Sequence, residues 1–154
     1  DVYKRQVTGL TQFDETVHLT NIWLKELMDE LGWEDRHRAY RALRSTLHVL
    51  RDRLPVESAA HLAAQLPMLV RGFYFEGWRP GGPRGDEHTK AEFVDHIKSA
   101  FSRGQNVYPE EVENVEEMAS AVLRILSKHV SQGEIEDIRG NLPKDIQSLW
   151  NASA

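Results

Sequence analysis

The sequence predicts an all-α protein of about eight helices, arranged as two tandem, related four-helix units packed as one bundle. Apolar residues recur at spacings of three and four along most of the chain, which indicates amphipathic helices. No stretch alternates between apolar and polar residues between hairpin turns, so a sheet is not expected. The two halves also match at a constant offset. A chain of 154 residues suffices for one compact domain or for two small units that share a core.

The first half of the chain carries four predicted helices. The first spans residues 11–31, has Phe13 and Val17 in its apolar stripe, and stops at Gly32. The second begins at Asp35, an N-cap residue, and ends before Pro55. The third spans residues 56–66, and the fourth begins at Pro67. The residues of the fourth helix that are expected to face inward are Leu69, Val70, Phe73 and Tyr74.

The second half repeats this plan after a connection rich in glycine and proline. Residues 79–88 form a flexible linker rather than a phosphate loop, because no strand precedes them and no Gly-Lys-Ser/Thr ends them. A fifth helix carries Phe93 and Phe101, a sixth opens at Pro109, and two shorter helices follow. We therefore expect one unit at residues 7–78 and a second at 89–151. Residues 1–6 resemble the translation of a sequencing adapter and are left out of the fold.

An internal repeat supports the division into two units. Placing Leu66-Pro67 on Leu142-Pro143 sets an offset of 76 residues, and this register holds without a gap from residue 39 to residue 74. Apolar residues then fall on apolar residues, as Leu47 does on Leu123. A four-helix unit of this size is marginal alone and gains stability by packing on its copy.

Several motifs of the chain resemble one bacterial family. They include Gly32-Trp33-Glu34-Asp35-Arg36, Ala39-Tyr40-Arg41-Ala42-Leu43, Gln65-Leu66-Pro67 and, in the second half, Gly133-Glu134-Ile135 through Leu142-Pro143. With them the chain resembles the DUF2267 family, a bacterial domain of unknown function, over nearly its whole length. The resemblance implies a helical protein of bacterial origin and carries over no catalytic residues.

Composition excludes several classes of function. The chain has no cysteine, so disulfides, thiolate zinc sites and cysteine nucleophiles are excluded. Its net charge of −5 argues against general nucleic-acid binding. No apolar run is long enough to span a bilayer, and no signal peptide is recognised, so we expect a soluble cytoplasmic protein without a membrane partner.

Two arrangements suggest chemistry but have simpler explanations. Glu15-x-x-His18 and Glu34-x-x-His37 each place a carboxylate and an imidazole on one helix face, yet a di-iron bundle needs further inward-facing glutamates. The acidic residues of the sixth helix are expected to form a solvated face near its start. They are Glu110, Glu111, Glu113, Glu116 and Glu117. We therefore expect no metal, no other cofactor and no catalytic residue.

A basic stripe on the second helix is the main candidate for function. It consists of His37, Arg41, Arg44, His48 and Arg51, which lie within an arc of about 80°. The offset of 76 places no such stripe on the copied helix, so the shared fold does not require it. One interpretation is a solvated stripe, or one paired with Glu26, Asp29 and Glu30 of the first helix. The other is a site for an acidic protein partner or a polyanion, since arginine binds carboxylate and phosphate with two parallel hydrogen bonds.

An aromatic cluster closes the first unit. Tyr74, Phe75 and Trp78 follow Phe73, and one helix cannot turn all of these rings into one core. We expect the extra rings to pack on the second unit, with a partner or ligand site as the alternative. The sequence thus favours a non-enzymatic protein-interaction or regulatory module. The alternative is a small-molecule-binding or enzymatic protein with a site in the cleft between the two units, which a deep pocket holding a buried charge would favour.

Overall fold

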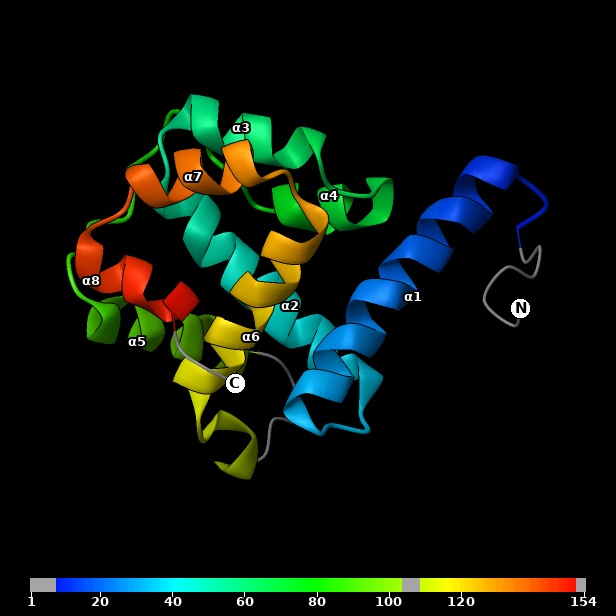
Figure 1. Cartoon of the computed structure of the whole chain (residues 1–154), viewed down its shortest axis with the longest axis horizontal. Helices are drawn as coiled ribbons and strands as arrows, with labels where there is room; N and C mark the ends of the chain where they lie inside the picture. The colour runs from blue at the N-terminus through cyan, green and yellow to red at the C-terminus, as the bar shows by residue number, and fades with distance from the viewer. Residues whose placement is uncertain (1–7, 104–108, 152–154) are drawn as a thin grey trace.

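The protein is all-α in the computed structural model, which describes residues 8–103 and 109–151. It contains no strand in these residues (Figure 1). The adapter-like residues 1–6 lie outside the described ranges. The α-helices are α1 (Thr11–Leu31), α2 (Arg36–Arg53), α3 (Val56–Ala64), α4 (Met68–Phe75), α5 (Lys90–Ser102), α6 (Val115–His129), α7 (Gln132–Gly140) and α8 (Lys144–Gln147). Two short 3₁₀ helices, η2 (Pro109–Val112) and η3 (Ser148–Asn151), precede and follow the last three.

Local sequence signals set the ends of the first two helices. Gly32 adopts the left-handed conformation, with φ of 69°, and its amide donates to the carbonyl of Met28 to close α1. The carboxylate of Asp35 accepts hydrogen bonds from the amides of His37 and Arg38 at 3.0 and 3.2 Å, which caps α2 as expected. These signals lie within one turn of the helix end, which is why they can be recognised in the sequence.

The start of α6 differs from the sequence prediction. Pro109 opens the separate 3₁₀ helix η2, and α6 begins only at Val115. Between them Asn114 has a φ of 58°, the left-handed conformation, which no residue inside an α-helix adopts. The sequence prediction treated η2 and α6 as one helix, whereas the left-handed residue Asn114 separates them.

Helices α2 and α6 pack on each other at the centre of the bundle. Helix α1 packs on α2, α4 and α6, whereas α5 packs on α6, α8 and α2. Helices α3 and α7 lie side by side at one end (Figure 1). Fully buried leucines fill the core, among them Leu43, Leu47, Leu50, Leu123 and Leu126. Helices α1 and α5, which open the two halves of the chain, therefore each contact both central helices, α2 and α6.

Two residues predicted to be apolar contacts of the core are exposed. Phe13 and Leu69 retain 47% and 45% of their surface. Figure 1 shows the reason for Phe13, because the N-terminal half of α1 extends beyond the other helices. Leu69 lies beside it, since its amide donates to the Thr16 hydroxyl at 2.8 Å. An apolar surface is thus left open where α1 and α4 meet.

Residues 79–88, expected to be a flexible linker, lie against the C-terminal end of α2. The amide of Gly85 donates to the carbonyl of Asp52 at 2.8 Å, and Arg53 Nε donates to the carbonyl of Glu87 at 2.9 Å. Arg84 Nη2 donates to the carbonyl of Arg53 at 3.2 Å. The bonds to Asp52 and Arg53 satisfy carbonyls at the end of α2, which lack partners within the helix.

Candidate functional site

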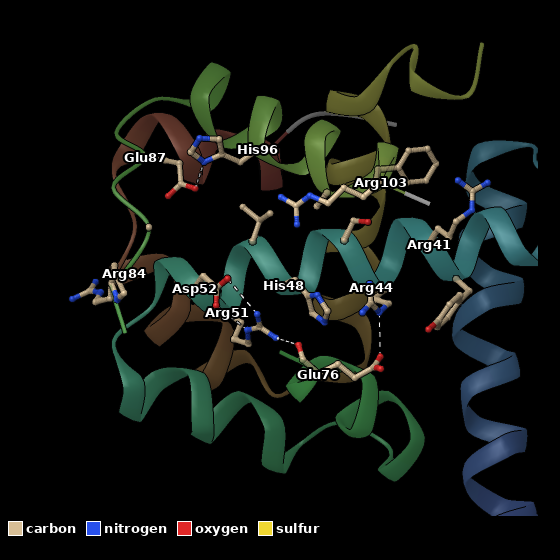
Figure 2. A pocket seen from close by; sticks show the side chains of 17 residues that line it. Arg41, Arg44, His48, Arg51, Asp52, Glu76, Arg84, Glu87, His96 and Arg103 are labelled. Carbon is tan, nitrogen blue, oxygen red and sulfur yellow. Dashed lines mark hydrogen bonds and ion pairs between the residues drawn. The ribbon is translucent and has the colours of Figure 1, made fainter. Parts of the chain in front are cut away.

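A cleft of about 590 Å³ runs along α2 and is the candidate functional site. Figure 2 shows α2 as its floor, α5 along one side, and the chain that follows α4 along the rest. Five arginines and three carboxylates line it, a net charge of +2 with the histidines neutral. They are Arg41, Arg44, Arg51, Arg84 and Arg103, with Asp52, Glu76 and Glu87. The cleft is therefore electropositive in a protein of net negative charge.

Most of the predicted basic stripe lines this cleft. Arg41, Arg44, His48 and Arg51 are among its residues, whereas His37 lies outside it. The His37 side chain is exposed and packs on the Tyr40 ring, with 6.0 Å between ring centroids. The stripe thus faces a space bounded by other elements and not an open helix surface.

The predicted pairing of the stripe with acids of α1 is wrong. Glu30 forms an ion pair with Arg124 of α6, Glu26 pairs with Lys128 and His129, and Asp29 pairs with Lys25. Burial raises the pKa of Glu26, but the hydrogen bonds and charges of Lys128 and His129 together bring it below its ordinary value. Helix α1 therefore neutralises cations of α6 and supplies no carboxylate to the cleft.

Arg51 has a structural role within the cleft wall. Its residue is 4% exposed, and Nη1 donates to the carbonyls of Tyr74 and Glu76 at 2.7 and 2.8 Å. Nε and Nη2 bind the carboxylate of Asp52 at 2.9 and 3.2 Å. Since these bonds use most of its donors, Arg51 holds the end of α4 and shapes the cleft.

Arg44 keeps donors that could serve a ligand, whereas Arg41 is enclosed. Arg41 Nη2 binds Glu111 Oε1 at 2.7 Å and its guanidinium lies over the Phe101 ring, while its Nε and Nη1 are buried and have no partner among the described residues. Arg44 Nε binds Glu76 Oε1 at 3.2 Å, and both side chains of this pair are more than a third exposed. Glu111 is 8% exposed, so the prediction that this glutamate belongs to a solvated face is wrong.

Arg103 brings a further guanidinium from the end of α5. Its side chain makes no hydrogen bond or ion pair with any other residue that the structure describes. In Figure 2 the side chain lies across the cleft above α2. An anion in the cleft would meet this group without breaking an existing contact.

His48 is held as a neutral imidazole. Its Nε2 lies 2.6 Å from the carbonyl of Phe73, and because a carbonyl only accepts, Nε2 carries the hydrogen. Burial lowers the pKa of His48, the hydrogen bond to the Phe73 carbonyl raises it in part, and the charges of Arg51 and Arg44 lower it again, so that the pKa stays below its ordinary value. The ring therefore offers Nδ1 as an acceptor at neutral pH.

In contrast to His48, His96 has a raised pKa, which is caused by its contact with Glu87. His96 Nδ1 lies 2.5 Å from Glu87 Oε2, and this hydrogen bond raises the pKa of His96. Glu87 is only 3% exposed, and Arg53 Nε lies 4.0 Å from its other oxygen. The pair adds a second imidazole to the cleft, one that favours the charged form.

The aromatic residues divide into buried and stacked rings. Tyr74 is completely buried, and its hydroxyl donates to the carbonyl of Ala59 at 2.7 Å, which removes it from any contact surface. Phe75 contacts Tyr74 and stacks on Trp78, with centroids 5.1 Å apart. Phe75 and Trp78 thus pack on each other and against the core.

Sequence reasoning missed six of the ten charged or histidine residues of the cleft. Two of them, Asp52 and Glu76, lie beside the stripe on α2 and at the end of α4. Arg84 and Glu87 lie in the presumed linker, His96 lies on α5, and Arg103 follows it. No local pattern marks these four, because the folding of the linker and of α5 against α2 brings them to the stripe. His18, expected to be solvated, is 8% exposed. No group of three or more potential metal ligands occurs in the residues described.

Comparison with protein families identifies the chain. The family described as an uncharacterized conserved protein, DUF2267, matches residues 20–149. The chain belongs to the DUF2267 family. Every residue that lines the cleft falls within the matched range. No curated protein matches this DUF2267 chain. Across its described residues, no helix is long and apolar enough to pass through a bilayer.

Proposed function

We propose that this DUF2267 protein binds a small anionic ligand in the cleft between α2 and α5. The observation that carries the proposal is the set of guanidinium donors on Arg44 and Arg103 that line the cleft and that no described residue uses. A carboxylate or phosphate would satisfy two such donors at once, and neighbouring positive charges would strengthen its binding. A volume of about 590 Å³ is in the range of small-molecule sites.

The buried charges of the cleft favour this proposal over an interaction module for an acidic protein partner. Arg51 and Glu87 are 4% and 3% exposed at the cleft wall, which fits a recessed site better than a flat docking surface. The neutral His48 and the Glu87-bound His96 would also serve a ligand that needs both an acceptor and a donor. We also propose that the protein is located in the bacterial cytoplasm, because its motifs resemble a bacterial family.

We also propose that residues 7–78 and 89–151 arose as two copies of one unit, with the site at their junction. In support, α3 and α7 begin and end 76 residues apart, at Val56–Ala64 and Gln132–Gly140. Pro67 and Pro143, at the same separation, have φ of −55° and −56° and an identical ψ of 149°. Helix α2 from one copy and α5 from the other then enclose the cleft.

The test is calorimetric titration with inorganic phosphate, pyrophosphate and citrate. A polyglutamate peptide, which represents an acidic protein partner, is titrated in parallel. We expect at least one small anion to bind, and Arg103→Gln to weaken it about 10- to 100-fold, the usual worth of a charged hydrogen bond. Arg79→Gln is the matched control, since Arg79 is exposed and outside the cleft. Binding of the peptide alone would instead support the interaction module, and equal affinities in the two variants would reject the cleft.

A further inference from the structure

A second groove, of about 750 Å³, lies between α1, α2 and α4 and differs in chemistry from the cleft. Its walls are largely apolar and include Val17, Leu24, Leu69 and Phe73. Leu69 is 45% exposed. Phe13, one turn before Val17 on the same face of α1, is 47% exposed. A contiguous apolar surface of this kind indicates a binding site more often than a random exposed side chain does.

The groove and the basic cleft adjoin. Tyr40 and Glu76 line both of them. The Tyr40 ring packs edge-on against Phe73, a wall of the groove, with 5.2 Å between centroids. Glu76 binds Arg44, a wall of the cleft. This ion pair is exposed and therefore weak, so a ligand anion can take over the guanidinium of Arg44 at the junction.

Continuity and charge together specify the ligand. The cleft offers the unused donors of Arg44 and Arg103, and the surface of the groove beside it is mainly apolar, with Arg36 and His37 of α2 among its polar residues. We infer that the DUF2267 protein binds a single anionic amphiphile, with its phosphate or carboxylate head at Arg44 and Arg103 and its alkyl chain along the groove. The inference rests on the proposed function of the cleft and names the class of its ligand.

A substitution at Gly72 can block the place proposed for the alkyl chain of the ligand without changing the site of its anionic head group. It lies in α4 and lines the groove, and a Cβ added there would meet no atom within 4 Å. Gly72→Leu therefore keeps the helix and projects a side chain into the groove. Leu69→Asp, at an exposed position, is a second variant that makes the same wall polar.

The experiment is a titration with inorganic phosphate and with ethyl, butyl, hexyl and octyl phosphate, each below its micelle concentration. For the parent protein we expect the affinity to rise about two- to fourfold for each methylene that enters the groove. Gly72→Leu and Leu69→Asp should remove this dependence on chain length and leave the affinity for phosphate unchanged. Arg103→Gln should weaken the whole series by one factor and keep the dependence.

The outcomes separate the two proposals. If phosphate binds but chain length has no effect in the parent, the amphiphile is wrong and the anion cleft stands. If no member of the series binds, the amphiphile is wrong, and the cleft is wrong as well when pyrophosphate and citrate also fail to bind. Octyl glucoside, which has no charge, should not bind, and binding equal to that of octyl phosphate would overturn the need for an anion. Vesicles of phosphatidylglycerol and phosphatidylcholine should not co-sediment the protein. Co-sedimentation without binding of octyl phosphate would point to a membrane surface and overturn the inference.

Discussion

Arg51 of α2 donates a hydrogen bond of 2.7 Å to the backbone carbonyl of Tyr74, in the last turn of α4. The same nitrogen donates to the carbonyl of Glu76 at 2.8 Å. A residue four turns along one helix thus terminates another. The basic stripe of the sequence contains this structural arginine beside arginines whose donors are unused, and only their burial and partners tell them apart.

Substitution of Arg51 should therefore lower stability far more than substitution of Arg44. Arg51→Met leaves two carbonyls of the α4 terminus without a donor, and we expect the free energy of unfolding to fall by about 2 to 4 kcal/mol. Arg44→Met removes only an exposed ion pair and should cost less than about 1 kcal/mol. Urea denaturation followed by circular dichroism measures both. Equal losses would contradict the roles assigned to the two arginines.

Leu47→Ala and Leu123→Ala should each destabilise the protein by about 2 to 5 kcal/mol. Both leucines are completely buried, one on each central helix, so each truncation removes apolar contacts and leaves a cavity. Chemical denaturation of the two variants beside the parent provides the measurement. A variant that unfolds at the parent's urea concentration would show that its site collapses or is less buried than described.

His96 and His48 should titrate on opposite sides of the ordinary histidine pKa of 6.5. The hydrogen bond to Glu87 raises the pKa of His96, whereas burial lowers that of His48. NMR titration of the imidazole carbons resolves the two. Glu87→Gln is the control and should return the pKa of His96 toward 6.5 without moving that of His48. The reverse order would show that these contacts do not govern the two rings.

The same bond predicts a direction for stability against pH. Because the folded pKa of His96 lies above its unfolded value, its contribution is complete below about pH 6.5 and is lost as the pH rises through the folded value. The free energy of unfolding of the parent should therefore decline over that range relative to His96→Gln. Denaturation series at several pH values test this, and a parent that gains stability relative to the variant would contradict the sign.

Gly85→Ala should uncouple the Glu87–His96 pair. A Cβ at Gly85 would overlap Glu87 Oε1 and lie 3.2 Å from its Cδ, so the buried carboxylate has to move. The pKa of His96 should then fall toward 6.5. Gly81→Ala is the matched control from the same segment, since nothing lies within 4 Å of its added Cβ. If both variants leave His96 unchanged, Gly85 does not position Glu87.

The elements that could be predicted are those with local causes. Gly32 and Asp35 mark a helix end and a helix start through bonds to residues within one turn, so the bounds of α1 and the start of α2 follow from the sequence. Asn114 illustrates the limit, because Pro109 is equally compatible with a helix start and with the 3₁₀ helix that forms there. Whether Asn114 reverses the backbone depends on tertiary packing.

The candidate site could be predicted only in part, for the same reason. The periodicity of α2 groups Arg41, Arg44 and His48 on one face, and the structure places all three in the cleft. Periodicity does not reveal that other helices surround this face, since arginine and histidine are usually solvated. Arg103 joins them only because α5 crosses α2, a contact between residues distant in the chain.

The packing of α1 on α6 and of α5 on α2 has a consequence for how the chain is assembled. Each half packs a helix on the central helix of the other half. The hydrophobic core is therefore shared, and neither residues 8–78 nor residues 89–151 can form it alone. Produced as separate polypeptides, the two pieces should stay unfolded apart and recover the native helices when mixed. If residues 79–88 are shortened until the two halves of one chain can no longer pack on each other, each half should pack on the complementary half of a second molecule. The product would be an interlocked dimer with the same interior.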